Sequence, residues 1–269
     1  MTRVTPESVS LLGVPVHPID YRVATDLVRQ WIQTRSQASS YIVQTNVLSL
    51  VTAKDSPVYH ETLEHSGLSV PDGMPLVWLL RRHGKSIKDR VYGPELMIRL
   101  CRIAEEEGWR CALVGGRPEI LKQLTRRLID RFPRLQIVYS YSPPFRKMSD
   151  DEDAEMCKNI NLARPDILWV GLGSPKQDIW MYGHRMRLTV PAMHGVGAAF
   201  DFLAGSVAQA PQWMMDAGLE WLFRFYAEPR RLWRRYTIVN IRFLWLLLRD
   251  EIHHWRSPIR SQKNSITSK

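Results

Sequence analysis

One aspartate stands where a carboxylate could take a proton from a substrate. Asp72 lies between Pro71 and Gly73, directly after the short apolar segment 68–70. A carboxylate held at the end of a strand can act as a general base on a hydroxyl group. An aspartate in a turn also commonly accepts a hydrogen bond from its own backbone, so the sequence leaves both roles open.

Two glycine-rich segments have the chemistry of phosphate-binding loops. Residues 171–177 are Gly-Leu-Gly-Ser-Pro-Lys-Gln and follow the apolar run 167–170. Glycines let a backbone approach a phosphate, and a helix that starts behind them offers free N–H groups. The second segment, Gly195-Val196-Gly197, has Phe200 where a dinucleotide fingerprint has its third glycine. We therefore predict a phosphate site, with a plain tight turn as the alternative, and disfavour a nicotinamide or flavin oxidoreductase.

The sequence predicts no metal site and no cofactor. Asp151 and Asp153 have the Asp-x-Asp spacing that many metal-dependent sugar transferases use for a divalent cation. They follow Ser149, and a serine cap with an acidic first turn favours a helix start, which is the preferred interpretation. The three cysteines form no CxxC pair, and the histidines form no HExxH motif.

The elements that must position these residues alternate between strands and helices. After a short strand pair at 10–16, strands are predicted at 41–44, 68–70, 110–114, 135–139, 166–170 and 190–194. Helices are predicted at 20–34, 47–53, 57–65, 74–82, 95–107, 118–131, 149–162, 175–187, 197–203, 213–226 and 229–255. This order predicts an α/β fold with a parallel sheet, whose short apolar strands are buried on both faces. Ligands bind such sheets beyond the carboxyl ends of the strands, which is where Asp72 and both glycine segments lie.

Composition and charge exclude several classes of protein. The chain has 269 residues, of which 45% are hydrophobic and 24% charged, so global disorder is excluded. Its start lacks the basic and apolar regions of a signal peptide. The apolar run 243–248 is far shorter than the roughly 20 residues that span a bilayer. We therefore expect neither a signal peptide nor a transmembrane helix.

The positive charge gathers at the C-terminal end. The net charge is +10, and residues 224–269 hold eleven of the basic residues but only three acidic ones. Large aromatic residues are interspersed among them. This mixture suits an anionic membrane surface or a nucleic acid, and an ordinary solvated helix face is the remaining alternative.

Several motifs occur together in a specific order. They are Asp72-Gly73, Arg90-Val91-Tyr92-Gly93, Val114-Gly115-Gly116, Val170 to Gln177, Gly195-Val196-Gly197 with Phe200-Asp201-Phe202, Ala210-Pro211, Gly218 to Arg224, and Glu228-Pro229-Arg230-Arg231. In this order the sequence resembles the WecG/TagA/CpsF glycosyltransferases of bacterial surface-polysaccharide synthesis, over about residues 10–236.

The resemblance implies an inverting, metal-independent glycosyltransferase. Such an enzyme moves a hexose-type sugar from a UDP-sugar to a polyprenyl-diphosphate-linked saccharide, without a cofactor. By resemblance, Asp72 is the catalytic general base. The implied substrate-binding residues are Thr45, Asn46, Arg90, Gly171, Gly173, Pro175, Lys176, Gln177, Gly195, Gly197, Phe200, Asp201, Arg224, Arg231 and Arg234.

The resemblance also implies an organisation and a location. We expect a Rossmann-like parallel sheet flanked by helices in residues 1–209, a helical, basic, membrane-associating appendage in 210–255, and a disordered tail in 256–269. The enzyme would lie in the cytoplasm, peripheral on the inner face of the plasma membrane, without nucleic acid; a homo-oligomer is left open. Two alternatives remain, a nucleotide-sugar transferase with a soluble acceptor and a basic nucleic-acid-binding module.

Overall fold

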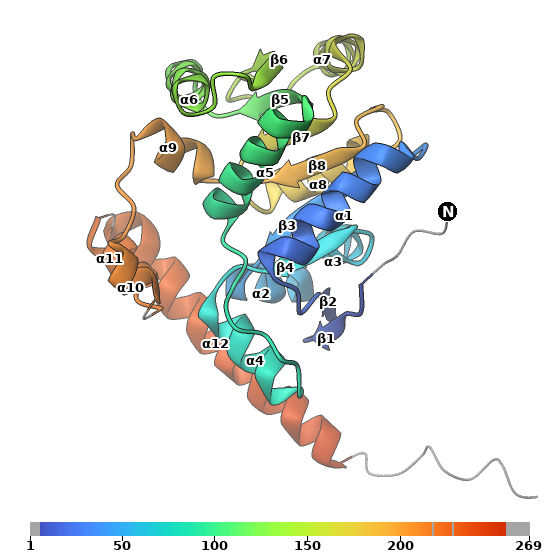
Figure 1. The fold of residues 1–269 in the computed structure, drawn as a ribbon. Helices are drawn as coiled ribbons and strands as arrows, with labels where there is room; N and C mark the ends of the chain where they lie inside the picture. Colours follow the sequence, from blue (N-terminus) through green and yellow to red (C-terminus); the bar gives the residue numbers. More distant parts are fainter. Residues whose placement is uncertain (1–5, 217, 228, 257–269) are drawn as a thin grey trace, which may run out of the picture.

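A parallel sheet forms the centre of the molecule (Figure 1). The computed structural model describes residues 6–216, 218–227 and 229–256. Its sheet has six strands in the order β4-β3-β8-β7-β5-β6, and every neighbouring pair is parallel. The strands are β3 (Ser40–Thr45), β4 (Leu68–Pro71), β5 (Arg110–Gly115), β6 (Gln136–Tyr141), β7 (Ile167–Gly171) and β8 (Ala192–Gly195). A separate antiparallel hairpin joins β1 (Val9–Leu11) to β2 (Val14–Val16).

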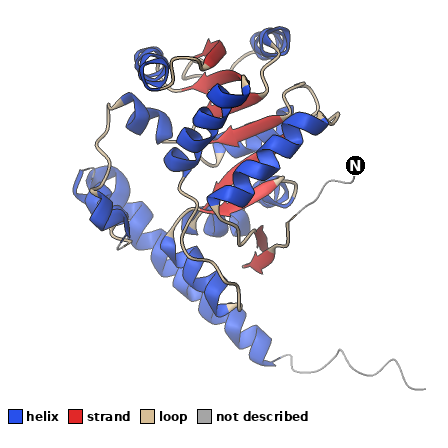
Figure 2. Cartoon of the chain, in the orientation of Figure 1, coloured by secondary structure: helices blue, strands red, loops and turns tan. Residues whose placement is uncertain are grey.

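Helices cover both faces of this sheet (Figure 2). One face packs against α1 (Tyr21–Thr34), α5 (Gly93–Glu107), α6 (Pro118–Arg131) and α9 (Ala199–Ala204). The other packs against α2 (Val47–Asp55), α3 (Pro57–Glu64), α4 (Met74–Arg82), α7 (Asp150–Ala163) and α8 (Lys176–His184). The central strands are accordingly buried along nearly their whole length, as residues 167–170 illustrate with exposures of 0%. The α/β class and the flanked parallel sheet that the sequence predicted are confirmed.

The C-terminal part is helical, but it is divided differently from the prediction. Instead of one helix at 213–226 there are α10 (Gln212–Asp216) and α11 (Glu220–Ala227). The break falls at Gly218, whose φ of +71° is left-handed and therefore ends a helix. The long helix α12 (Pro229–Arg256) follows and includes Arg256, with which the disordered tail was predicted to begin. The rest of that tail, residues 257–269, lies outside the described part.

Smaller differences concern element ends. The helix predicted at 175–187 ends at His184, and the last sheet strand is Ala192–Gly195 rather than 190–194. The strand predicted at 135–139 runs from Gln136 to Tyr141. These shifts leave the elements and their order unchanged.

Helix α12 packs back onto the body of the protein. Phe243 and Leu246 are buried in the same cluster as α2 and α4 side chains, and Arg242 pairs with Asp55 at the end of α2. Among the described residues, no helix is both long enough and apolar enough to cross a bilayer.

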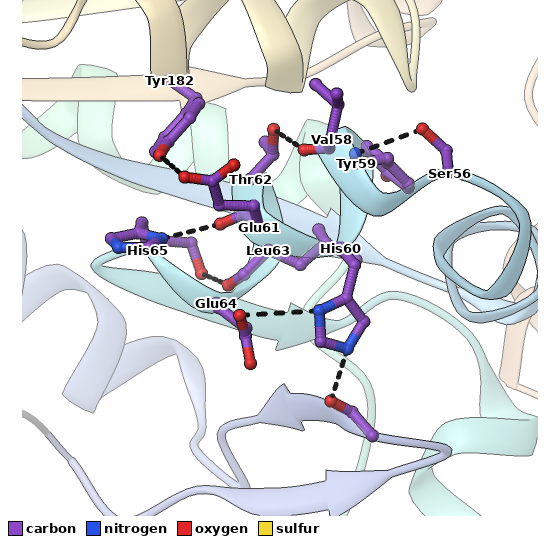
Figure 3. Close-up of polar contacts among 12 residues, drawn as sticks. Ser56, Val58, Tyr59, His60, Glu61, Thr62, Leu63, Glu64, His65 and Tyr182 are labelled. Atoms are coloured by element: carbon purple, nitrogen blue, oxygen red, sulfur yellow. Dashed lines mark hydrogen bonds and ion pairs between the residues drawn. The ribbon is translucent and has the colours of Figure 1, made fainter.

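Helix α3 ties the hairpin to α8 (Figure 3). The His60 imidazole lies 3.0 Å from the Gly13 carbonyl in the hairpin, and Tyr182 of α8 donates to Glu61 at 2.5 Å. Deeper in, the Tyr59 hydroxyl donates to Asp178 Oδ2 at 2.9 Å. The Ser174 hydroxyl donates to the same oxygen at 2.7 Å. The start of α8 is therefore held in place from behind.

Close backbone packing between β5 and β7 predicts that a glycine-to-alanine substitution there destabilises the protein more than the same substitution at an open turn. A Cβ at Gly115, where φ is +128°, would lie 2.5 Å from the Gly171 carbonyl. We expect Gly115→Ala to cost about 3 kcal/mol in unfolding free energy, because backbone cannot give way as a side chain can. Gly84→Ala is the matched control, since φ there is +75° and nothing lies within 4 Å. It should cost about 1 kcal/mol. Denaturant unfolding measures the free energy of unfolding of both variants. Equal losses in the two would contradict the close packing of Gly115 against Gly171.

The buried carboxyl of Asp178 predicts a pH dependence of stability. Burial raises its pKa to about 6, against the opposing hydrogen bonds from Ser174 and Tyr59. Between pH about 4 and about 6 the folded state keeps a proton that the unfolded state releases. Stability should therefore fall with rising pH through this window, by on the order of 3 kcal/mol, and not change further above it. Asp178→Asn has no proton to release.

The measurement is the difference in unfolding free energy between wild type and Asp178→Asn from pH 4 to 7. We expect the unfolding free energy of the wild type to fall relative to that of the variant as the pH rises to about 6. Above that pH the difference should stay constant. A difference that is flat throughout, or that grows in favour of the wild type, would contradict the raised pKa.

Candidate functional site

A cavity of about 1080 Å³ opens at the carboxyl edge of the sheet. One wall consists of the segments that follow β3, β4, β5, β7 and β8. The opposite wall comes from α4, α11 and α12, including Leu244 and Leu247 of the last helix. Polar loop ends therefore face an apolar helical wall across one cavity. Of the implied site residues, the cavity is lined by Asn46, Asp72, Arg90, Gly171, Gly173, Lys176, Gln177, Gly197 and Asp201.

Asp72 is held at the floor of the cavity by its backbone. It follows β4, and its N–H donates to the Thr45 carbonyl at the end of β3 at 2.7 Å. The next residue, Gly73, has a φ of +139°, which a side chain would rarely allow. The turn that follows the strand therefore fixes where the carboxylate stands, and α4 begins directly behind it.

Arg90 connects the sheet edge to the helical wall. Its guanidinium donates to Glu220 at 2.6 Å, with side-chain exposures of 13% and 11%, and lies 4.5 Å from the centre of the Tyr92 ring. Burial alone would lower the pKa of Arg90, but the Glu220 and Asp72 carboxylates together raise it. A permanent positive charge thus lies within the electrostatic reach of Asp72.

Glu220 was missed by the sequence analysis. It occurs in the motif 218–224, but an acidic residue at a helix start is commonplace, because it complements the helix dipole. Its pairing with a residue 130 positions earlier is set by the tertiary fold. The signal that could have pointed to Glu220 is Arg90, because an arginine expected in a binding site commonly pairs with a carboxylate.

Gln177 braces the two glycine loops rather than standing free. Its side chain is 2% exposed, and its Oε1 accepts from the Gly173 N–H at 3.1 Å and from the Gly197 N–H at 2.9 Å. The turn after β7 and the turn after β8 are thereby held together. A Cβ at Gly173 would meet nothing within 4 Å, so this turn is open to the cavity.

The start of α8 has no side-chain cap. Pro175 occupies the cap position and makes no side-chain hydrogen bond to the helix, while Lys176 follows as an exposed residue. The Gln177 and Asp178 N–H groups already donate to the Gly173 and Pro175 carbonyls, so it is the positive end of the helix dipole and the exposed Lys176 that favour an anion here. The arrangement is therefore suited to binding a diphosphate.

Four implied site residues do not line the cavity, and the structure gives each a supporting place instead. Thr45 is fully buried and bonds to the Ser69 hydroxyl at 2.6 Å, and Pro175 precedes α8. Gly195 lies under Met181, where a Cβ would be 2.7 Å away from it. Phe200 packs so tightly on Gly171 that a Cβ there would lie 2.4 Å from its ring. A direct contact of these four residues with substrate stays a prediction.

The remaining expected residues divide into two groups. Asn46 caps α2, since its Oδ1 accepts from the Ser49 N–H at 3.3 Å, while Asp201 lies on α9 at the cavity. The side chains of Arg224, Arg231 and Arg234 lie outside the described part, although their backbones belong to α11 and α12.

The Asp151–Asp153 segment behaves as a helix start. Ser149 caps α7 in a reciprocal arrangement with Glu152, as the sequence predicted. Asp153 pairs with His184 at 2.8 Å and with Arg187 at 2.5 Å. Cys157 lies close to Asp153 and His184, and these are the sole described ligand-type residues with spacing suited to a metal ion. The Arg187 guanidinium already satisfies the carboxylate, and none of the three lines the cavity.

Comparison with known proteins agrees with these observations. The sequence model of the glycosyl transferase WecG/TagA/CpsF family matches residues 9–257. A Bacillus subtilis (strain 168) protein named N-acetylglucosaminyldiphosphoundecaprenol N-acetyl-beta-D-mannosaminyltransferase is 28% identical over 177 residues, which are 66% of this chain and 67% of that protein. A Staphylococcus aureus (strain NCTC 8325 / PS 47) protein of the same name is 26% identical over 230 residues, 86% of this chain and 89% of its own. A family match of this extent shows that the chain belongs to the WecG/TagA/CpsF family of glycosyltransferases.

Proposed function

We propose that this chain transfers a hexose-type sugar from a UDP-sugar to a polyprenyl-diphosphate-linked saccharide, with inversion and without a metal ion. The observation that supports it most is the meeting of Asp72, Arg90 and the open turn before α8 in one cavity. A base, a cation and an anion-binding helix start are the parts such a transfer needs.

Asp72 has the place required of the base. An inverting transfer is a single displacement, so the acceptor hydroxyl must lose its proton as it attacks the sugar carbon. A carboxylate fixed by the turn at Gly73 can take that proton. The positive charge of Arg90 lies within electrostatic reach of this carboxylate, since Asp72 helps to raise the pKa of Arg90.

The opposite end of the cavity suits the leaving UDP. As the sugar–phosphate bond breaks, negative charge grows on the diphosphate. The positive end of the α8 dipole and the Lys176 ammonium can stabilise this charge, and the Gln177 side chain holds the backbone of the turn in place. The arginines at 224, 231 and 234 would add to this at the membrane. In this proposal these groups stabilise the charge on the leaving diphosphate, a role that a divalent cation has in metal-dependent enzymes.

The helical wall suits a lipid-borne acceptor. The two relatives described above are named for a diphosphoundecaprenol-linked N-acetylglucosamine. Here the helices around the cavity expose large apolar side chains to solvent: Trp78, Trp213, Trp221, Ile241, Trp245 and Leu248. Together with the basic C-terminal residues, they favour binding to an anionic membrane surface. We place the enzyme peripherally on the cytoplasmic face of the plasma membrane.

The role of Asp72 is tested by Asp72→Asn. We expect a loss of 100-fold or more in transfer to a polyprenyl-diphosphate acceptor, because general-base catalysis typically contributes about 10²–10⁴-fold. The assay uses a panel of UDP-sugars with EDTA present. Asp151→Asn is the matched control and should keep the full rate. Full activity of Asp72→Asn would refute the base, and wild-type activity that requires added metal would refute metal independence.

Membrane binding is tested on the exposed face of α12. Leu248 is 61% exposed on this helix. Leu162, which is 69% exposed on α7, serves as the matched control. Leu248→Glu should weaken flotation with anionic vesicles about tenfold or more, since it removes an inserted side chain and adds repulsion. Leu162→Glu should float like the wild type. Equal flotation of both variants and the wild type would contradict docking through α12.

A further inference from the structure

The helical wall of the cavity has an apolar strip to which the transfer chemistry gives no role. On α12, Val239, Phe243 and Leu247 recur every four residues and so lie along one face of the helix, with Leu244 beside them. From Val239 to Leu247 the strip is about 12 Å long, given the rise of an α-helix. Of the described α12 residues that line the cavity, Asn240 alone is polar.

Helix α4 adds apolar side chains to the same wall (Figure 1). Met74, Trp78 and Leu79 line the cavity there. Trp78 is 57% exposed and Leu244 of α12 is 59% exposed, although both side chains are large and apolar. Among the described residues that line the cavity, neither α4 nor α12 contributes a charged one. We call the surface formed by these side chains of α4 and α12 the apolar groove.

The apolar groove has the chemistry of a hydrocarbon site. Apolar side chains that are open to water are stabilised when a hydrocarbon covers them. The hydroxyls of a sugar and the charges of a diphosphate would lose hydrogen bonds to water there, and few groups would replace them. The polar parts of the donor therefore do not suit this part of the cavity.

The apolar groove begins next to the proposed base. Met74 follows Asp72 by two residues, and both line the same cavity. An acceptor whose hydroxyl lies at Asp72 can therefore extend its other end along α4 and α12. In a polyprenyl-diphosphate-linked saccharide, that other end is the hydrocarbon chain. Residues 224–269, which include α12, hold eleven basic and three acidic residues, and this charge complements the diphosphate between saccharide and chain.

We propose that the apolar groove binds the first isoprene units of the acceptor's polyprenyl chain, while the rest of the chain stays in the bilayer. This inference rests on the proposed function, because it assumes a lipid-linked acceptor. It is distinct from the docking of the protein on the membrane, since Ile241, Trp245 and Leu248 are exposed on α12 but do not line the cavity. One face of α12 would thus hold the lipid of the substrate, and another would contact the bilayer.

The test uses acceptor analogues in solution, without any membrane. N-acetylglucosaminyl diphosphate that carries a methyl, geranyl or farnesyl group is offered to the full-length protein with the UDP-sugar, free of detergent and below the concentration at which the farnesyl analogue forms micelles. We expect kcat/KM to rise about tenfold or more from the methyl to the farnesyl analogue, because the groove removes the hydrocarbon from water. A kcat/KM that does not depend on the chain would overturn the proposal.

Leu244→Asn tests the groove itself. It should lower kcat/KM for the farnesyl analogue about tenfold and leave kcat/KM for the methyl analogue within about twofold, because the methyl analogue does not reach the groove. Ile238→Asn is the matched control, since Ile238 is 54% exposed on the same helix and does not line the cavity. It should change neither value. Equal losses for both analogues in Leu244→Asn would contradict a contact with the chain.

Calorimetry with the same analogues distinguishes this inference from the proposed function. If no sugar is transferred to any analogue, the proposed function fails, but tighter binding of the farnesyl analogue that is lost in Leu244→Asn still supports the groove. If sugar is transferred and the farnesyl group adds no affinity in the wild type, the groove is refuted while the proposed function stands. In that case the bilayer alone holds the lipid chain.

Discussion

A parallel sheet buried on both faces constrains where polar groups can gather. Its central strands are almost entirely buried, so side chains that can contact a ligand lie mostly in the segments beyond the strand ends. Because all strands are parallel, the segments after β3, β4, β7 and β8 meet at one edge. The cavity, the aspartate and the glycine turns are consequences of that arrangement.

The second constraint is that this edge is closed by helices from the C-terminal end of the chain. The Arg90–Glu220 ion pair and the burial of Phe243 and Leu246 attach that wall to the body. The same helices expose large apolar side chains on their outer surface. In the proposed function, one wall contacts both the substrate and a lipid surface, which would give a physical reason for a basic, aromatic C-terminal segment in a protein whose described helices do not span a bilayer.

The sequence was sufficient for features that depend on local patterns. Strand and helix order, the cap at Ser149 and the strand-end position of Asp72 follow from periodicity and turn residues. It was insufficient where partners are distant. Gln177 was expected to bind substrate, and only the structure shows that its side chain accepts hydrogen bonds from two backbone N–H groups in different loops. Phe200 and Thr45 lie in motifs at the cavity, yet they face the core, because which residue of a loop faces the ligand depends on tertiary packing.

The most direct measurement of the central claim is a crystal structure of the full-length protein with UDP bound. The account predicts UDP in the cavity, with its diphosphate at the start of α8 beside Gly173 and Lys176, and with space left between it and Asp72 for a sugar. UDP bound elsewhere, such as in the smaller hollow lined by Lys122 and Ser142, would contradict the account.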